Sequence, residues 1–216
     1  MTDRRSRGIL IAIEGIDGAG KSTLQRNLAA RYRRRGWRVA IAREPADPTL
    51  GRAAQRATPK DPVAGALLFT LDRALARPGI AAALARGAIV LQDRSYYSTL
   101  AYQGSALPAA QERSLVTLQR QVTLEPDRIL WVDLPPARAL ARVWDRGRER
   151  SPLERIPTLR KVRRAYRGLL RPPRWIRLDG EASPPEIAEA AERALERFVA
   201  PRMRRARRTA RGRSSA

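Results

Sequence analysis

The chain contains no cysteine and no histidine, and these two absences limit its chemistry. Without cysteine there can be no disulfide, no thiolate nucleophile and no cysteine-ligated zinc site. Without histidine the chain lacks the commonest general base and the commonest metal ligand. Any reaction must therefore use Asp, Glu, Lys, Arg and hydroxyl groups, which favours chemistry based on positioning and charge neutralisation.

Acidic residues are also scarce: 21 Asp and Glu stand against 44 Lys and Arg, giving a net charge of +23. A polyanionic partner, phosphate substrates or a general compositional preference for arginine would each explain this charge. Residues 200–216 hold seven arginines and no acid, and removing them leaves +23 − 7 = +16, so the rest of the chain is basic too. Aromatic residues make up only 5% of the chain, which is few for stacking on nucleic-acid bases.

Long apolar runs are absent as well. The arginines before Ile9 and the short apolar run after them resemble the start of a secretion signal, but Glu14 and Asp17 interrupt the run. No run approaches the length that crosses a bilayer. With 216 residues, 43% of them hydrophobic, we expect one globular domain in the cytoplasm.

A glycine-rich motif follows the first apolar run. Gly15, Gly20, Lys21 and Ser22 fit the pattern Gly-x4-Gly-Lys-Ser/Thr, the phosphate-binding loop of many nucleotide-binding proteins. Glycines let backbone N–H groups approach a polyphosphate, and the following helix adds its positive N-terminal end. Lys21 can reach phosphate oxygens, and Ser22 can ligate Mg²⁺. The predicted ATP-binding residues are Gly15, Ile16, Asp17, Gly18, Ala19, Gly20, Lys21, Ser22 and Thr23.

Apolar strands alternate with helices along the remaining chain. Strands are predicted at residues 9–13, 37–42, 88–92, 128–133 and 174–178. Helices are predicted at residues 21–35, 50–57, 62–76, 78–87, 97–103, 108–122, 136–145, 158–170 and 184–198. Residues 146–157 are polar, basic and interrupted by prolines, which indicates an exposed loop.

This alternation predicts an α/β fold: a three-layer P-loop NTPase type with a five-stranded parallel sheet covered by helices on both faces. Such sheets bind ligands at the carboxyl ends of their strands, where Arg43-Glu44-Pro45 and Asp93-Arg94 join the phosphate loop. We predict one nucleotide-binding domain over residues 1–199, with a short basic lid at about 142–157. Residues 200–216 are predicted to form a basic, disordered tail.

The residues around the loop distinguish among P-loop proteins. A GTPase needs an Asn-Lys-x-Asp element, but the only asparagine is Asn27. A motor or helicase ATPase usually pairs a strand-end Asp with Glu, whereas Asp93 precedes an arginine. A kinase for a phosphorylated acceptor needs a second anion site, for which Arg43, Arg73 and Arg94 are candidates.

From about residue 9 to 198 the chain resembles the thymidylate kinase family. The resemblance rests on several motifs in order along the chain. They are the loop at residues 14–23, Arg43-Glu44-Pro45 with Leu50-Gly51, the segment 67–73, Asp93-Arg94-Ser95, Ser98 with residues 101–104, the segment 132–136, Arg146-Gly147-Arg148, and Val162-Arg163 with Tyr166.

The resemblance implies transfer of the ATP γ-phosphoryl group to deoxythymidine monophosphate (dTMP), with Mg²⁺, in a homodimer. It implies that Phe69 stacks on thymine, Arg73 bonds a base carbonyl, Arg94 holds the acceptor phosphate and Tyr102 packs beside the deoxyribose. It places Asp17 near the acceptor and Mg²⁺, with Ser22 as the other metal ligand. The substrate-binding residues that it implies are Asp17, Glu44, Phe69, Arg73, Arg94, Thr99 and Tyr102.

Family members without a basic residue inside the phosphate loop take a transition-state arginine from the lid. The variable loop positions here, residues 16–19, contain no cation, so the lid over residues 142–150 should supply it. Arg146 and Arg148 are the candidates, beside Lys21, Arg94 and Asp17 as catalytic residues. The acceptor is already an oxyanion, so the reaction needs charge compensation rather than a general base.

Three features depart from the family pattern. Ser95 replaces the usual aromatic residue, Thr99 stands where some members use Asn, and residues 46–49 lack the paired glycines of many members. The first two concern pyrimidine recognition. Two rivals therefore remain: a kinase for another deoxynucleotide or deoxynucleoside on this fold, and a nucleic-acid-binding ATPase using the basic surface. In the preferred interpretation nucleic acid is not required.

Overall fold

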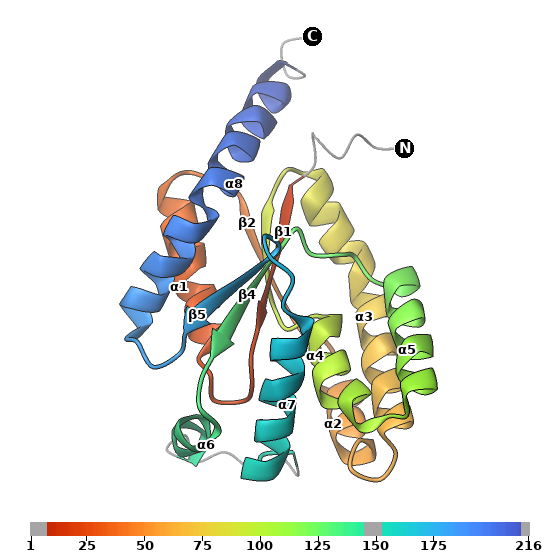
Figure 1. Ribbon diagram of the computed structural model, residues 1–216. Coiled ribbons are helices and arrows are strands. Elements are labelled where there is room, and N and C mark those ends of the chain that lie inside the picture. The colour runs from red at the N-terminus through yellow and green to blue at the C-terminus, as the bar shows by residue number, and fades with distance from the viewer. Residues whose placement is uncertain (1–7, 145–152, 213–216) are drawn as a thin grey trace.

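The computed structural model describes residues 8–144 and 153–212, and in it the five predicted strands form one parallel sheet. The strand order is β2-β3-β1-β4-β5, so the first strand lies at the centre (Figure 1). Every neighbouring pair is parallel. The strands are β1 (Ile9–Glu14), β2 (Val39–Arg43), β3 (Ile89–Asp93), β4 (Arg128–Asp133) and β5 (Trp175–Asp179).

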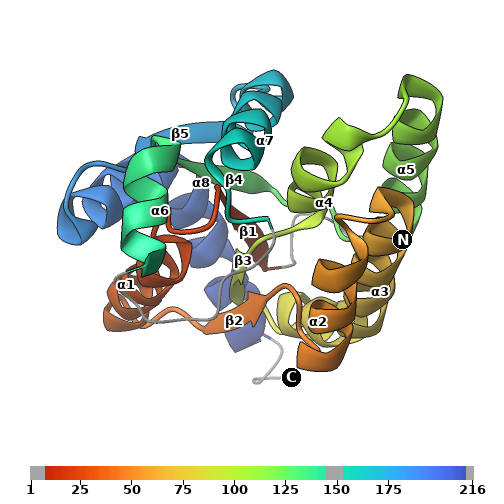
Figure 2. The ribbon, with the colours of Figure 1, turned by 90° about the horizontal axis from the view of Figure 1, so that it is seen from below.

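Helices cover both faces of this sheet, as predicted. Helices α1 and α8 pack against each other on one face, and the helices α3, α4, α5 and α7 lie on the other (Figures 1 and 2). The helices are α1 (Lys21–Arg34), α2 (Pro48–Ala57), α3 (Pro62–Ala85), α4 (Tyr96–Tyr102), α5 (Ala109–Val122), α6 (Pro136–Trp144), α7 (Ile156–Leu169) and α8 (Pro184–Gly212), with a 3-10 turn at Gly104–Ala106. In the described part of the chain, no helix is both long and apolar enough to span a membrane.

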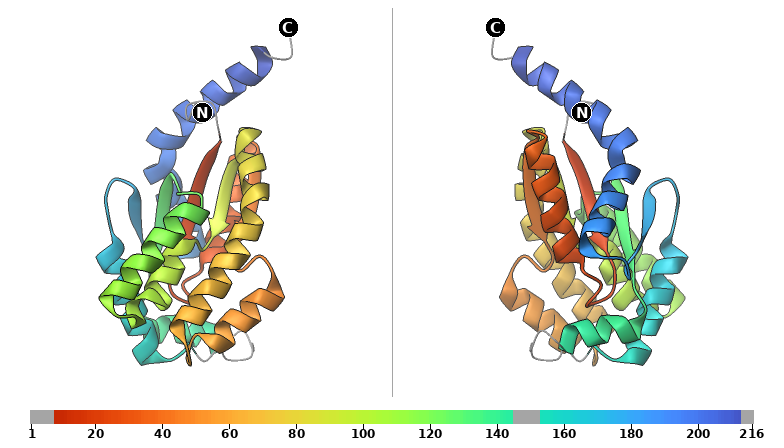
Figure 3. Two further views of the ribbon diagram at one scale, coloured as in Figure 1. Left: turned by 90° about the vertical axis from the view of Figure 1, so that its right-hand side faces the viewer. Right: turned by 90° about the vertical axis from the view of Figure 1, so that its left-hand side faces the viewer.

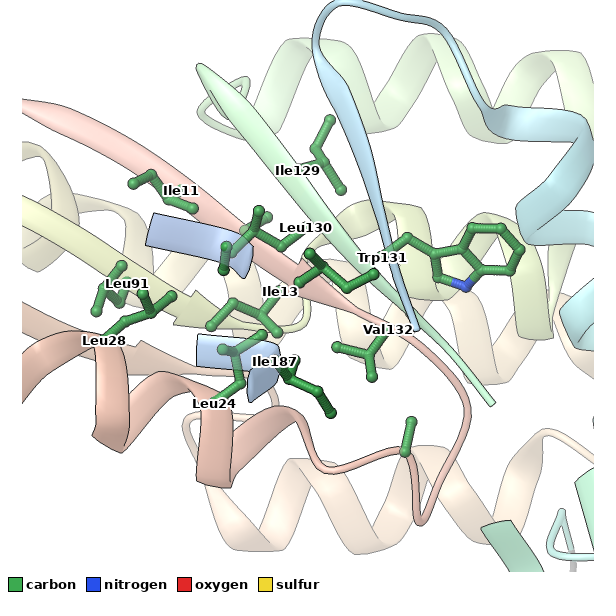
Figure 4. Close-up of a cluster of buried hydrophobic side chains, with 14 of the residues drawn as sticks. Ile11, Ile13, Leu24, Leu28, Leu91, Ile129, Leu130, Trp131, Val132 and Ile187 are labelled. Carbon is green, nitrogen blue, oxygen red and sulfur yellow. The ribbon is translucent and has the colours of Figure 1, made fainter. Parts of the chain in front are cut away.

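The core explains why the central strands are continuously apolar. All six residues of β1 are buried, because helices cover the sheet from both sides. Figure 4 shows Ile11 and Ile13 of β1 among side chains from neighbouring strands and from α1. This packing fixes the register of the parallel strands, so their carboxyl ends and the polar residues that follow meet at one edge.

The helix α3 differs from the prediction. The sequence predicted a break before Pro78, but α3 continues from residue 62 to 85 with Pro78 inside it. Pro78 is exposed, so water can satisfy the carbonyl that loses its N–H partner. Both halves of the helix also pack against the body, through Ala66 in one cluster and Leu84 in another. Tertiary packing therefore outweighs the local cost of proline.

The C-terminal helix α8 is also longer than predicted. The sequence predicted a helix ending near residue 198 and a disordered tail from residue 200, but α8 continues through Pro201 to Gly212. Val199, Ala200 and Met203 are buried. The predicted boundary thus cuts a packed helix, whose far end projects from the body (Figure 3).

Candidate functional site

The glycine-rich loop joins the carboxyl end of β1 to the start of α1 in a conformation that requires glycine. Gly15 and Gly18 both have positive φ, at 147° and 84°. A Cβ at Gly15 would lie 2.7 Å from the Val132 carbonyl oxygen, and one at Gly18 would lie 2.1 Å from the Ala139 carbonyl oxygen. The loop therefore packs tightly beside β4 and α6, and its end forms the N-terminus of α1, where a helix offers free N–H groups to an anion.

Lys21 begins α1 and is nearly buried, with 7% of its surface exposed. Its ammonium donates a hydrogen bond to the Ile16 carbonyl at 2.9 Å. Burial, followed by the positive charge of Arg94, lowers the pKa of Lys21 to about 8, against opposing effects of Asp17 and Asp93. Bound phosphate oxygens would restore the charge balance around this ammonium.

Ser22 and Asp93 meet at the end of β3, where the Ser22 hydroxyl donates to the Asp93 carboxylate at 2.5 Å. Sequence reasoning named Ser22 and Asp17 as metal ligands and did not include Asp93. The available signal was an acid directly at the end of an apolar strand. The described residues contain no group of three or more acidic side chains placed to hold a metal ion by themselves. A hydroxyl and one or two carboxylates still fit Mg²⁺, which keeps several waters and takes substrate phosphate oxygens.

Arg94 has a left-handed backbone, with φ at 71°, which is unusual for a residue other than glycine. Its backbone N–H donates to the Ile13 carbonyl at 2.9 Å, which ties the turn to β1. The guanidinium donates to Asp17 at 2.5 Å and to Ser98 at 2.9 Å, and lies 5.2 Å from the centre of the Tyr102 ring. The strained turn thus aims Arg94 at the phosphate loop.

The pair formed by Asp17 and Arg94 keeps both side chains charged. Burial alone would raise the pKa of Asp17, but the charges of Arg94 and Lys21 lower it below its ordinary value. Burial alone would lower the pKa of Arg94, but Asp17 raises it well above its ordinary value. The Tyr102 hydroxyl lies 3.2 Å from the Asp17 carboxylate and accepts from the Asp17 backbone N–H.

A buried carboxylate that sequence reasoning missed supports this pair from below. Glu14, the last residue of β1, is fully buried and accepts from the Ser95 N–H at 2.7 Å and the Ser95 hydroxyl at 2.6 Å. It also lies within hydrogen-bond distance of the Ser98 and Tyr166 hydroxyls, at 2.7 Å and 2.9 Å. Ser98 in turn accepts from Arg94, so Glu14 fixes the position of Arg94 through Ser98.

Arg73 of α3 is buried in a second polar network. Its guanidinium donates to both carboxylate oxygens of Glu44, with a shortest contact of 2.6 Å, and to Thr99 at 3.1 Å. It also donates to the Gln119 side chain at 2.5 Å, and Gln119 donates to Thr70 at 2.5 Å. Gln119 and Thr70 were not predicted, because nothing in the sequence relates α5 to α3.

Glu44 belongs to the same network and accepts from Gln92 at 2.6 Å as well. Burial raises the pKa of Glu44, and the charge of Arg73 opposes that rise. The following loop is held by Asp72, whose carboxylate accepts from the backbone N–H groups of Ala46 and Asp47 at 2.8 Å and 2.7 Å. These contacts shape the loop where the paired family glycines are missing.

Two adjoining cavities open beside these residues. The first, of about 310 Å³, includes Phe69, Arg73, Thr99 and Tyr102 in its lining. The second, of about 330 Å³, follows the phosphate loop and the exposed Arg43. Five residues line both cavities: Asp17, Glu44, Pro45, Gln55 and Arg94. The two cavities therefore adjoin along these five residues, Arg94 among them.

Every described residue that the sequence analysis placed in the site lies in or beside these cavities, but their roles stay predictions. Arg146 and Arg148 lie outside the described residues. Leu153 and Glu154, which follow that segment, line the first cavity. Ser95, one of the departures, is buried against Glu14 and does not line it.

Comparisons with known proteins agree with this geometry. The family model described as thymidylate kinase matches residues 13–191. A thymidylate kinase of Xanthomonas campestris pv. campestris (strain B100) is 36% identical over 204 residues, covering 91% of this chain and 87% of that protein. A thymidylate kinase of Synechococcus sp. (strain JA-2-3B'a(2-13)) is 36% identical, covering 83% and 90%. A probable thymidylate kinase of Archaeoglobus fulgidus is 36% identical, covering 73% and 80%.

Proposed function

The chain belongs to the thymidylate kinase family, and from this we propose that it transfers the γ-phosphoryl group of ATP to dTMP, giving dTDP and ADP for dTTP synthesis. One observation carries the proposal for this chain: two cavities, one along a phosphate loop and one lined by Phe69 and Arg73, meet at Arg94. That arrangement suits two polyanions held in line.

The two cavities divide the substrates between them. We assign the triphosphate of ATP to the cavity along the loop, where Lys21 and the first backbone N–H groups of α1 face it. We assign dTMP to the other cavity, with Phe69 against the base and Tyr102 beside the sugar. Arg94 then compensates the charge of the acceptor phosphate, whose oxyanion attacks without a general base.

Mg²⁺ is assigned to Ser22 and Asp93, with Asp17 as the nearest further carboxylate. When bound there, the ion would neutralise charge on the ATP phosphates. Ser22 already contacts Asp93 at 2.5 Å, so the two oxygen donors lie on one side of the loop cavity. Asp17 is held by Arg94, which favours a role at the acceptor phosphate over direct ligation.

Arg73 supports selection of a pyrimidine that carries a carbonyl group at C4. Among the described residues, Glu44, Thr99 and Gln119 accept hydrogen bonds from four of the five N–H groups of Arg73. The remaining N–H can donate to the carbonyl at C4 of thymine, whereas cytosine carries an amino group at that position, which offers it no acceptor. Thr99 is engaged by Arg73, so it acts on the base through this arginine in our proposal.

The remaining features of the proposal are a lid, a dimer and a cellular location. We assign residues 1–199 to the catalytic domain, with a lid at about 142–157 that supplies Arg146 or Arg148 to the transition state. A homodimer is supported by an exposed apolar stripe on α3, spaced four residues apart, which needs cover. It comprises Val63, Leu67, Leu71 and Leu75. A cytoplasmic location fits the nucleotide substrates.

Steady-state assays with all four deoxynucleoside monophosphates and with thymidine test the proposal. We expect ADP release to depend on the acceptor, with dTMP preferred by kcat/KM. A preference for another acceptor would replace dTMP by that compound on the same fold. ATP hydrolysis stimulated by DNA, with no acceptor phosphorylated, would reject the kinase.

A further inference from the structure

Helix α8 changes character along its length. Its first half carries glutamates that pair with α1: Glu192 lies 2.8 Å from Arg31 and Glu196 lies 2.6 Å from Arg35. Beyond Phe198 the chain has no acid at all, while residues 200–216 hold seven arginines. A general preference for arginine does not explain this switch, because the same helix uses acids freely before it.

The basic half of α8 also leaves the body of the protein. Met203 is its last buried residue among those with described side chains, and the helix continues to Gly212, a further length of about 14 Å at 1.5 Å per residue. Figures 1 and 3 show it projecting at the end of the sheet where β1 begins. Packing against the core therefore does not account for Arg202 and Arg204, which are exposed.

Other arginines gather at the same end, where the parallel strands begin. Arg38 precedes β2, Arg86 follows α3 and Arg128 starts β4. Among the described residues, none of these three has a carboxylate within ion-pair distance, and the same holds for Arg202 and Arg204 of α8. We call this set the amino-end basic surface: Arg38, Arg86, Arg128, Arg202 and Arg204. Of the acids nearby, Glu125 pairs with Arg174, and the Asp127 carboxylate accepts from the Leu10 N–H while its charge partly offsets that of Arg128.

Two of these cations crowd one ring. The guanidinium carbons of Arg128 and Arg202 lie 3.6 Å and 3.8 Å from the centre of the Phe198 ring. Each gains from contact with the ring, but the two repel each other. Burial first, and then the charge of Arg202, lower the pKa of Arg128. An anion at this point would relieve the repulsion.

We propose that the amino-end basic surface and the projecting end of α8 dock the phosphate backbone of nucleic acid. Guanidinium groups match phosphate oxygens in pairs, and a row of them along a helix matches a repeating polyanion. An anionic membrane fits less well, because the only large apolar residue in 200–216 is Met203, which is buried. No base-reading element is involved, so the contact is independent of sequence.

This surface lies at the opposite end of the sheet from the nucleotide cavities, which follow the carboxyl ends of the strands. A strand of six residues separates the two ends by about 20 Å. Nucleic acid docked there leaves both cavities open. The inference therefore does not depend on the identity of the phosphoryl acceptor.

The test is fluorescence anisotropy of the full chain with a labelled duplex oligonucleotide, titrated over a range of salt. The variant Arg202→Gln with Arg204→Gln should weaken binding and lower the slope of log K against log salt by about 1.8, since each lost contact removes about 0.9. The control Arg52→Gln with Arg113→Gln removes the same charge from exposed positions on α2 and α5. It should leave the slope unchanged, and both variants should keep the kinase turnover.

Three results would overturn the proposal. If both variants lost the same affinity for the oligonucleotide, binding would depend on the overall charge of the protein and not on this surface. Displacement of the oligonucleotide by saturating ATP and dTMP would place it in the nucleotide cavities. Binding to vesicles of phosphatidylcholine and phosphatidylserine that the oligonucleotide cannot compete away would assign the surface to a membrane.

Discussion

The titration of Lys21 should be visible in the stability of the free protein. Burial lowers the pKa of Lys21 from 10.5 to about 8. Below about pH 8 the folded protein therefore contains a buried ammonium, which lowers the free energy of unfolding. The unfolded chain keeps this proton until the pH nears 10.5. Between these two values the unfolded state binds more protons, so the free energy of unfolding should rise with pH. The gap corresponds to about 3 kcal/mol, at about 1.36 kcal/mol per pH unit.

Replacing Lys21 by Met removes the buried charge and nearly keeps the volume. At about pH 7, where both states of the original protein are protonated, Lys21→Met should raise the free energy of unfolding by up to about 3 kcal/mol. The lost hydrogen bond to Ile16 reduces this gain by about 1 kcal/mol. The variant should also lack the rise in stability between about pH 8 and pH 10.

Urea unfolding at a series of pH values measures both effects, and the composition of this chain makes them readable. The chain has no histidine or cysteine, its only other lysines are Lys60 and Lys161, and its five tyrosines ordinarily titrate near pH 10, so the effect of Lys21 is read below about pH 9.5. Lys161→Met is the matched control, because it removes a lysine from the exposed surface of α7. A rise with pH that survives in Lys21→Met, or a variant less stable than the original at neutral pH, would refute the reasoning.

The same titration should limit catalysis from the alkaline side. The free protein loses the Lys21 proton near pH 8, whereas bound phosphates hold it, so kcat/KM for ATP should fall above about pH 8 while kcat persists to higher pH. Lys21→Arg keeps a charge at all these pH values. Whatever its turnover, its profile for kcat/KM should lose this alkaline limb, and an unchanged limb would assign it to another group.

Three further predictions concern the acceptor cavity and α8. Arg94→Ala should lower kcat by about 10²–10³ while ATP affinity, measured by calorimetry, changes little, because one charge-stabilising donor is lost; near-normal turnover would remove Arg94 from the mechanism. Gln119→Leu should raise KM for dTMP and reduce the preference for dTMP over dCMP without changing KM for ATP, because Arg73 loses one support; equal effects on both substrates would indicate a folding defect instead. Truncation after residue 200 should lower the free energy of unfolding by about 1–3 kcal/mol through loss of buried Met203, whereas truncation after residue 205 should not; urea unfolding separates the two.

The features that sequence predicted well are local or periodic. The phosphate loop is a contiguous motif, and β1 is an unbroken apolar run, so both could be placed within a residue or so. Arg43, Asp93 and the phosphate loop were expected to lie together because the carboxyl ends of parallel strands lie at the same end of the sheet. Arg73 and Arg94 were candidates for a second anion site, the family resemblance added their expected roles, and both line the first cavity.

The features that sequence missed depend on contacts between distant segments. Glu14 and Tyr166 are 152 positions apart, and Arg73 and Gln119 are 46 apart, so no local pattern relates them. Pro78 was read as a helix break because its local cost is visible in sequence, whereas the packing that outweighs it is not. Residues 200–212 lack apolar periodicity, and one buried methionine gave no signal that the helix continues.

The contacts of Arg94 explain how a chain without histidine can be ready for phosphoryl transfer. In the free protein its guanidinium is held by Asp17 and Ser98, and among the described residues two of its five N–H groups have no acceptor. An entering phosphate can therefore bind Arg94 without displacing Asp17, so the cation is already oriented and its counter-charge stays in place. Because neither side chain changes charge near neutral pH, the acceptor side should keep its charge constant across the pH range in which Lys21 titrates. The pH dependence of the reaction should accordingly come from the ATP side.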